Sequence, residues 1–387
     1  MRILLVTSRY PPYTGGVERH VSAVAERLVA RGHEVTVRTA DATVARGGTR
    51  TPARRERRNG ARVVRHRSVT PGGAFHVAPG VLPAVRRADA DVVHAHNYHS
   101  LPLLLAALGS SARVRGGSSA TFVATPHYHG ASASRFRNRL LRAYRPIGGR
   151  ALRGADAVVA VGDRERRALA RDFGVAAEVI PNGLDVERFA EATPAPPATH
   201  AARDRPYLLC VGRLEAYKGV QHAIRALPRL EHALLVAGTG PAESDLRRVA
   251  REVGVEDRVR FLGYVPDDEL PGLYAGAEAF VALSAFEAYG MTVAEALAAG
   301  TPCVVRQAGA LGDWAARDDC VGVEFDGDGD ASAIDAGGGG GGDGNARPAD
   351  AVAAGVAEAV GRRAPSEPLP TWDEAVDALE ALYRRVA

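Results

Sequence analysis

Two acidic residues, Glu287 and Glu295, stand eight positions apart in an otherwise apolar stretch between residues 284 and 306. Glu287 follows a short apolar segment, and Glu295 is the only charged residue of the helix that should begin near Met291. A helix that is apolar on all sides is usually buried, and a buried carboxylate needs hydrogen-bond partners. The pair therefore indicates a binding site. The same residues would also be explained if Glu287 were an ordinary loop acid and Glu295 faced the solvent.

The residues around these acids carry clear secondary-structure signals. Residues 291–299 are good helix formers, Gly300 is placed to end the helix, and Pro302 blocks its continuation. The apolar segments 279–283 and 303–305 on either side have the character of buried strands. The pattern predicts a strand, a loop, a helix and another strand, which is the repeating unit of parallel α/β folds.

The same alternation opens the chain. A buried strand at residues 3–7 is followed by a loop that contains Gly15 and Gly16, then by a helix that ends at Gly32 and a second strand. A glycine-rich loop in front of a helix N-terminus is a natural anion site. It does not have the GxGxxG spacing of a dinucleotide-binding loop.

We therefore expect an α/β protein with two Rossmann-like, doubly wound domains that face each other across a cleft. The N-terminal domain should span 1–190, and a linker rich in proline and alanine should follow at 191–206. The C-terminal domain should span 207–370. Within it, the composition of 326–349 is typical of a disordered low-complexity insert, and 371–387 should form an amphipathic helix.

The overall composition is that of a soluble globular protein, with 46% hydrophobic and 24% charged residues in 387. The three cysteines are scattered among apolar residues, which argues against a disulfide framework or a metal cluster. The first ten residues are typical of a strand rather than a signal peptide, and the chain has no apolar run of about 20 residues. These features predict a cytoplasmic protein.

Of the 49 basic residues only Lys218 is a lysine, and this bias makes its position informative. The arginines of 46–67 are expected in a solvated or mobile loop, and without interleaved aromatic residues they do not indicate nucleic-acid binding. A helix is expected at 134–146, and the arginines of 135–153 stand in and after it beside apolar and aromatic residues. That helix could hold the protein peripherally on the inner, anionic face of a membrane, and a solvated helix face would fit the same residues.

Several short motifs together resemble the GT-B-fold retaining glycosyltransferases of family 4, the glycosyltransferase group 1 domain. Each motif is weak alone, but all stand in family order along nearly the whole chain. They are the Gly15-Gly16-Val17-Glu18 loop, Arg31-Gly32-His33-Glu34-Val35, His94-Ala95-His96, Thr125-Pro126-His127, Ile180-Pro181-Asn182-Gly183-Leu184-Asp185, Val211-Gly212-Arg213-Leu214 with Lys218-Gly219, Gly238-Thr239-Gly240-Pro241, Phe261-Leu262-Gly263, and the pair Glu287 and Glu295.

The resemblance implies a role for each matching residue. Arg213 and Lys218 would hold the diphosphate of a nucleotide-sugar donor, Glu295 its ribose and Glu287 its sugar. The other implied donor contacts are Gly15 and Gly16 at the phosphates, Gly238 in a motif turn, Tyr264 and Val265 near the base, and His127 at the sugar. The histidines His94, His96 and His129 are more simply explained as structural. The resemblance also implies that the last helix crosses back to the N-terminal domain.

The function implied is metal-independent, retaining transfer of a sugar from a nucleotide-diphosphate sugar to a hydroxyl of a glycan, a lipid-linked acceptor or a small molecule. No cofactor other than this donor substrate is expected. Two fixed cations can stabilise the departing diphosphate without a metal, and Asp89-Ala90-Asp91 has the character of a turn that starts a strand. The chain departs from the family pattern at Leu283, Ala288 and residues 308–313. An inactive nucleotide-sugar-binding subunit and a nucleotide-sugar epimerase of the same fold therefore remain alternatives.

Overall fold

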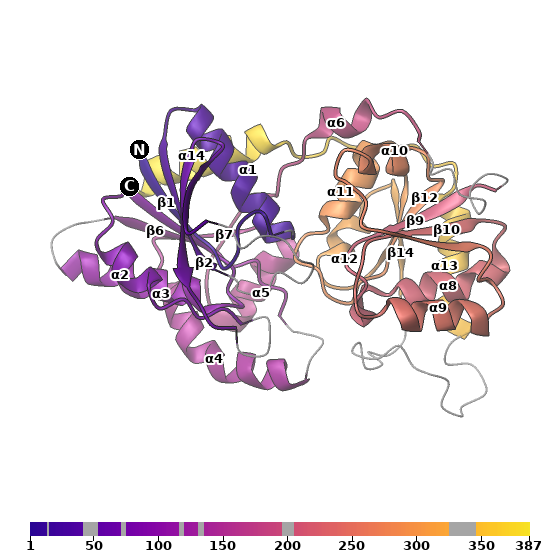
Figure 1. Ribbon diagram of the computed structural model, residues 1–387, viewed down its shortest axis with the longest axis horizontal. Coiled ribbons are helices and arrows are strands. Elements are labelled where there is room, and N and C mark those ends of the chain that lie inside the picture. The colour runs from indigo at the N-terminus through magenta and orange to yellow at the C-terminus, as the bar shows by residue number, and fades with distance from the viewer. Residues whose placement is uncertain are drawn as a thin grey trace. The chain divides into compact units, whose positions relative to one another are not determined.

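The computed structural model describes residues 1–13, 15–41, 53–70, 75–115, 120–130, 135–195, 205–324 and 346–387. The chain divides into two compact units, each with its own parallel sheet (Figure 1). The first unit comprises Met1–Gly130, Asn138–Gly183 and Pro370–Ala387, and the second comprises Ala131–Arg137 and Leu184–Leu369. The first boundary thus falls a few residues before the position that the sequence suggested, because Leu184 and Phe189 pack into the core of the second unit.

The sheet of the first unit has eight strands in the order β3-β4-β2-β1-β5-β6-β7-β8, all parallel except for the antiparallel pair β3 and β4. Its central strands are apolar and almost completely buried, as expected when helices cover both faces of a parallel sheet. The strands are β1 (Arg2–Val6), β2 (Glu34–Asp41), β3 (Arg55–Arg58), β4 (Ala61–Arg67), β5 (Val92–His96), β6 (Thr121–Thr125), β7 (Ala157–Ala160) and β8 (Glu178–Val179).

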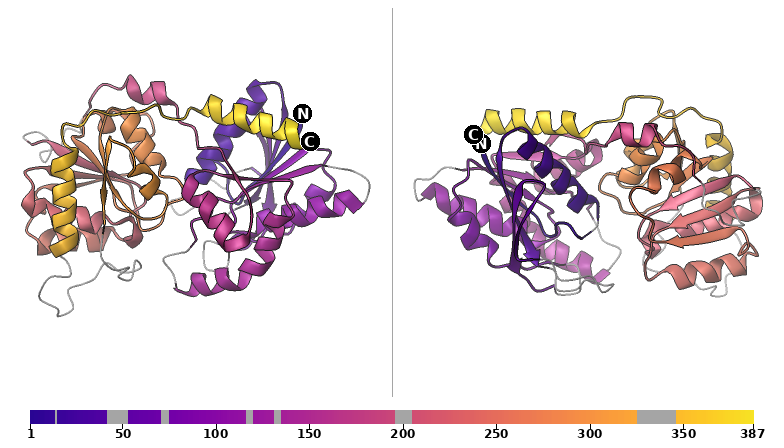
Figure 2. Two further views of the ribbon diagram at one scale, coloured as in Figure 1. Left: turned by 180° about the vertical axis from the view of Figure 1, so that it is seen from behind. Right: turned by 45° about the horizontal axis from the view of Figure 1, so that its top comes forward.

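The helices of this unit are α1 (Gly16–Ala30), α2 (Val81–Arg86), α3 (Leu101–Arg115), α4 (Arg135–Arg153), α5 (Asp163–Phe173) and the final helix α14 (Trp372–Val386). The last helix packs against α1, and Figure 2 shows the two ends of the chain side by side on this unit. A capping box between Thr371 and Glu374 fixes the start of α14. The chain at Gly183 approaches this start so closely that any side chain there would collide with the backbone of Trp372.

The expectation of a solvated loop at 46–67 is wrong for the part of it that the structure describes. Residues 55–58 and 61–67 form β3 and β4, and the side chain of Arg65 is fully buried. Its guanidinium donates to the carbonyl oxygens of Ala53 and Pro11, at 2.8 and 2.6 Å, and pairs with Glu56 at 2.7 Å. Three acceptors thus offset the burial of the charge.

The sheet of the second unit is parallel throughout and has the order β11-β10-β9-β12-β13-β14. The strands are β9 (Tyr207–Val211), β10 (Ala233–Ala237), β11 (Val259–Gly263), β12 (Ala279–Ala282), β13 (Cys303–Arg306) and β14 (Cys320–Val323). Its helices are α6 (Val186–Ala190), α8 (Val220–Ala226), α9 (Glu243–Glu252), α10 (Leu270–Ala275), α11 (Met291–Ala298), α12 (Leu311–Trp314) and α13 (Ala346–Ala359), with short 3-10 turns at Ala216–Lys218 and Leu227–Arg229.

The predicted insert at 326–349 is described only in its last part. Residues 346–349 belong to α13, and the remainder lies outside the described residues. Among the helices that the structure describes, none combines the length and hydropathy needed to span a bilayer.

Candidate active site

The strand order of the second unit defines where a ligand should bind. The chain adds β10 on one side of β9 and β12 on the other, so the winding direction reverses between β9 and β12. In open parallel sheets, ligands bind beyond the carboxyl ends of the strands at such a reversal. The loop after β9 carries Arg213 and Lys218, and the loop after β12 carries Glu287. The fold therefore brings together three of the residues that the sequence singled out.

Lys218 and Glu287 contact each other directly. The ammonium Nζ of Lys218 donates to Oε1 of Glu287, and the hydroxyl of Ser284 lies 3.2 Å from the same oxygen. The two charged side chains are only about one-fifth exposed, at 19% and 22%. A left-handed conformation at Gly219, with φ at 76°, lets the chain pass so close to Leu283 that a Cβ would collide with its carbonyl oxygen.

A shallow crevice opens at this point and is lined by both loops, including Gly212, Arg213, Lys218, Ser284, Glu287 and Thr292. The Arg213 side chain is 68% exposed and makes only loose contacts, with Nη2 3.3 Å from the hydroxyl of Tyr217. Its guanidinium is therefore available to an anionic ligand. The crevice offers an exposed cation, a second cation held by a carboxylate, and that carboxylate itself.

Glu295 lies beneath this surface rather than in it. The residue is 2% exposed, and its Oε2 accepts a hydrogen bond of 2.8 Å from the hydroxyl of Tyr274 on α10. The expectation that a carboxylate on this helix needs a buried partner is confirmed. The predicted contact between Glu295 and a ribose stays a prediction.

The remaining predicted residues of this unit follow the neighbouring strands. Gly238 directly follows β10, and its N–H donates to the carbonyl oxygen of Gly263 at 2.7 Å. Tyr264 and Val265 directly follow β11 and line a second hollow together with Arg188. All three lie at the carboxyl edge of the sheet, as the crevice does.

Comparison with known proteins identifies this arrangement. Residues 194–334 match the family described as glycosyl transferases group 1, and residues 14–188 match glycosyltransferase family 4. A GDP-mannose-dependent alpha-(1-6)-phosphatidylinositol monomannoside mannosyltransferase of Mycobacterium tuberculosis is 33% identical over 338 residues, which are 80% of this chain and 81% of that protein. The chain belongs to the family 4 glycosyltransferases. A glycogen synthase of the same organism is 32% identical over 347 residues, 81% of this chain and 80% of that protein.

Solved structures show that this glycosyltransferase has the GT-B fold. A sucrose-phosphate synthase from Thermosynechococcus elongatus superposes with a TM-score of 0.72 at 19% identity, over 100% of this chain and 99% of that chain. The Anabaena protein HepE, solved in complex with UDP, superposes over 100% of both chains with a TM-score of 0.67 at 18% identity. The predicted fold class and the predicted enzyme class are thereby confirmed.

The segment 308–313, which departs from the family pattern, still holds the loop of Glu287. Gly309 has φ at 53° and lies against the backbone of Glu287, whose carbonyl oxygen is 3.4 Å from the amide of Ala310. Trp314 at the end of α12 donates from Nε1 to the carbonyl oxygen of Tyr289 at 2.6 Å. Residues 309–314 of the glycosyltransferase thus contact the backbone of the loop that carries Glu287.

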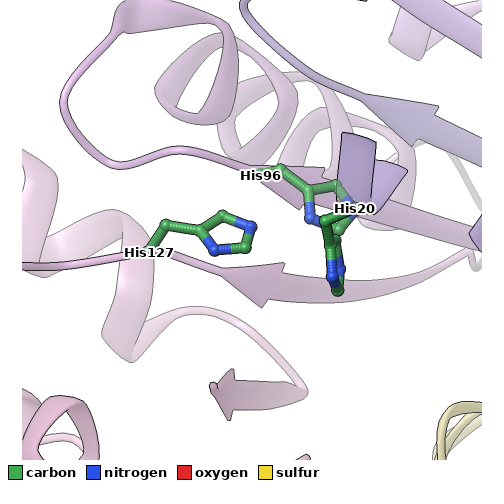
Figure 3. Close-up of side chains that lie close together, drawn as sticks. All are labelled: His20, His96 and His127. Atoms are coloured by element: carbon green, nitrogen blue, oxygen red, sulfur yellow. The ribbon is translucent and has the colours of Figure 1, made fainter. Parts of the chain in front are cut away.

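In the first unit of the glycosyltransferase, the predicted residues also lie where the winding direction reverses, between β1 and β5. Gly15 and Gly16 form the start of α1 after β1, and His127 follows β6 with a left-handed φ of 48°. His127 is buried and lies beside two further histidines, His20 on α1 and His96 at the end of β5 (Figure 3). His20 could not be identified from the sequence, because no local pattern shows that its side chain points from α1 toward the ends of β5 and β6.

The three histidines are uncharged because they are buried. Burial lowers the pKa of His20 to about 4 and holds the pKa values of His96 and His127 well below 6.5, so the three rings are neutral at neutral pH. The backbone after His127 is fixed by Glu165, which accepts the N–H of Tyr128 at 2.5 Å and that of Val161 at 2.8 Å. Burial raises the pKa of Glu165 to about 7.

His94 has a different environment from its neighbours. Its Nδ1 lies 2.6 Å from the hydroxyl of Tyr383 on α14, and its Nε2 lies 2.7 Å from that of Thr125. Both ring nitrogens are satisfied, which agrees with the structural role expected for His94.

The acidic pair Asp89 and Asp91 is also engaged. Arg2 pairs with both carboxylates, and its backbone N–H donates to Asp91 at 2.7 Å. These contacts join the start of β5 to the start of β1. They agree with the interpretation of Asp89-Ala90-Asp91 as a turn that starts a strand.

Proposed function

We propose that this glycosyltransferase moves a sugar from a nucleotide-diphosphate sugar to an acceptor hydroxyl with retention of configuration, and that this transfer needs no metal ion. The observation that carries the proposal is the meeting of Arg213, Lys218 and Glu287 at the strand reversal of the second unit. Cleavage of a sugar–phosphate bond leaves negative charge on the diphosphate. Cations fixed at that place stabilise the charge without reorganisation, and each charge-assisted contact contributes about 1.5–3 kcal/mol.

The residues have separate tasks in this proposal. Arg213, whose side chain is exposed, binds the diphosphate of the incoming donor. Lys218 stabilises the negative charge that develops on the leaving oxygen. Glu287, held by Lys218 and Ser284, accepts hydrogen bonds from hydroxyls of the donor sugar. Front-face attack lets the diphosphate itself accept the acceptor proton, so the retaining reaction needs no enzymatic base. His127 remains our candidate for a further contact with the sugar.

The relatives limit the donors worth testing. One relative is named as GDP-mannose-dependent and another as a glycogen synthase, and structural neighbours were solved with UDP and with ADP. The experiment is to incubate the protein with GDP-mannose, UDP-glucose and ADP-glucose and to measure release of the nucleoside diphosphate. Release from one donor, lost in Glu287→Gln, is the expected result. Binding without release would favour an inactive binding subunit, and interconversion of two sugars without release would favour an epimerase.

Chelation tests the metal-independent part of the proposal. Turnover should persist in excess EDTA, because Arg213 and Lys218 supply the positive charge. Loss of turnover in EDTA and its restoration by Mg²⁺ or Mn²⁺ would refute this part alone. The double variant Asp89→Asn with Asp91→Asn is the matched control, and its donor turnover should stay within a factor of about two, because both acids pair with Arg2 rather than with the site.

For the acceptor we propose a lipid-linked glycan reached from the membrane surface. Helix α4 exposes Leu140 and Ile147, seven positions apart and therefore on one face, at 51% and 56%. The exposed Arg139 and Arg150 flank this face, and the exposed Arg142 lies on another side of the same helix. Basic residues contribute about 1 kcal/mol each near an anionic bilayer. The mycobacterial relative is named for a phosphatidylinositol-linked acceptor, which supports the idea.

Sedimentation with vesicles tests this acceptor proposal. The protein should bind phosphatidylglycerol vesicles at low salt and detach at high salt, and the variant Arg139→Glu with Arg142→Glu and Arg150→Glu should not bind. Binding that survives this triple substitution would show that another surface is responsible.

A further inference from the structure

Three histidines from three separate elements of the first unit converge on one point. His20 comes from the second turn of α1, His96 from the end of β5 and His127 from the loop after β6, and their rings face one another in Figure 3. One ring nitrogen of each lies within 4.8 Å of the others. All three residues are 5% exposed or less. The point lies at the carboxyl edge of the sheet, where its winding reverses and where ligands of such sheets bind.

Three buried ring nitrogens of this group have no hydrogen-bond partner within the part of the chain that the structure describes. Both ring nitrogens of His96 and Nε2 of His127 are buried without a hydrogen bond, and the side chain of Asn182 is the polar neighbour of His20. His94, in ring contact with His96, has both nitrogens bonded in the same core. Because buried polar groups are normally satisfied, a cluster of unsatisfied nitrogens needs an explanation, and a missing ligand is one that the geometry can test.

The ring positions match those of a metal site. The ring centroids lie 5.1 Å apart for His20 and His127, 5.4 Å for His20 and His96, and 5.7 Å for His96 and His127. A tetrahedral zinc ion with nitrogen ligands at roughly 2.0–2.1 Å places such centroids roughly 5 Å apart. Small ring rotations would bring the nitrogens to bonding distance. We propose that His20, His96 and His127 bind one Zn²⁺ or a similar borderline transition metal, with a fourth position left open.

The chemistry of the ligands selects the class of ion. Neutral imidazole suits zinc, copper, iron and nickel, whereas calcium and magnesium prefer oxygen ligands. Trp372 is in ring contact with His20, and the uncharged side chain of Asn182 is the polar neighbour of the same ring. The proposal therefore concerns Zn²⁺ and its substitute Co²⁺, not the Mg²⁺ or Mn²⁺ that would serve a diphosphate.

Occupation of this site would have a regulatory consequence, which rests on the function proposed above. His127 is our candidate for a contact with the transferred sugar, and a nitrogen that binds zinc cannot also bind a hydroxyl. Zinc should thus inhibit transfer, and EDTA should relieve the inhibition while leaving the metal-free activity unchanged. The same ion would lock α1, β5 and the loop after β6 together.

Metal binding is measured first, without any donor, so that its outcome is independent of turnover. The chelator-treated wild type is titrated with Zn²⁺ by calorimetry and with Co²⁺ by visible absorption. We expect one ion per chain and the intense visible bands of four-coordinate Co²⁺. In His20→Leu and His96→Leu the affinity should fall at least about tenfold, the low end of what even indirect changes to a metal site cost.

The chain offers a matched control in His99→Leu. The Nε2 atom of His99 is likewise buried in this unit without a hydrogen bond, but the ring stacks on His129 and lies outside the group of three. Its substitution should leave zinc affinity within a factor of about two. Because the nitrogens of His96 make no hydrogen bond to the described residues, His96→Leu should keep the wild-type circular dichroism and melting temperature, and the same two measurements check the folding of His20→Leu.

Three results would overturn the proposal. They are the absence of 1:1 binding in the wild type, the weak bands of six-coordinate Co²⁺, and an affinity unchanged in two folded leucine variants. Zinc that binds at the three histidines but leaves turnover unaffected would refute the inhibitory consequence. A protein that binds zinc but releases no nucleotide from any donor would instead count against the proposed function.

Discussion

Replacement of Lys218 by arginine keeps the charge and changes only its shape. The ammonium of Lys218 reaches Glu287 beside the ring of Tyr217, 5.6 Å from its centroid, and its side chain is 19% exposed. A guanidinium is a wider, rigid fork and would displace Glu287 or turn outward. Loss of one charge-assisted hydrogen bond costs about 1.5–3 kcal/mol, or roughly 10- to 150-fold in rate. We expect the loss of turnover to be near the low end of this range for Lys218→Arg and near its high end for Lys218→Met.

The assay is release of the nucleoside diphosphate from the donor that the wild type uses, with melting temperature as a check on folding. Arg229→Lys is the matched control, since Arg229 forms an exposed ion pair with Asp350 in the same unit and such pairs contribute about 0–1 kcal/mol. Its turnover should not change by more than about twofold. Turnover of Lys218→Arg within a factor of about two, or ~0.4 kcal/mol in the barrier, would show that the single lysine of the chain has no special role.

A double-mutant cycle tests whether Lys218 and Glu287 act together. The effects of Lys218→Met and Glu287→Gln on turnover should be non-additive by about 0.5–3 kcal/mol, because each substitution removes one charge of the ion pair between them. Additive effects would mean that the contact is unimportant for catalysis.

Two further predictions concern stability. Tyr274→Phe should lower the free energy of unfolding in urea by about 1–3 kcal/mol, because it removes a hydroxyl donor from the buried carboxylate of Glu295; an unchanged midpoint would show that the other contacts of Glu295 suffice. Burial lowers the pKa of His66, His76 and His222 to about 4. The unfolded chain therefore binds protons that the folded chain does not, and the melting temperature should fall as the pH falls from about 6.5 to 4. A flat profile in that window would refute this account.

The sequence was most informative where the physical signal is local. The strand, loop and helix around Glu287 and Glu295 follow from apolar runs, a glycine and a proline, and the structure has them as β12 and α11. The order of motifs also placed Arg213 after a strand end. Parallel sheets bring such ends to one edge, so local signals and topology together sufficed to assemble the crevice.

Tertiary packing overrode the local signal elsewhere. The helix expected at 134–146 continues through Pro146 to Arg153, although proline normally ends or kinks a helix. Gly148 packs so tightly against Tyr98 and Tyr144 that a Cβ there would collide with both rings, and this contact supports the extra turns. The partners of Glu295 and the grouping of His20 with two distant histidines depend on similar long-range contacts, which no local pattern contains.

The return of α14 to the first unit has a consequence for how the protein is made. Trp372 and Tyr383 are buried in that unit, and the hydroxyl of Tyr383 lies on Nδ1 of His94. A ribosome synthesises residues 1–183 long before it reaches these side chains, whereas residues 184–369 of the second unit form one continuous segment. Most of the first unit is therefore translated before the second unit, but its core is complete only after α14 has been synthesised.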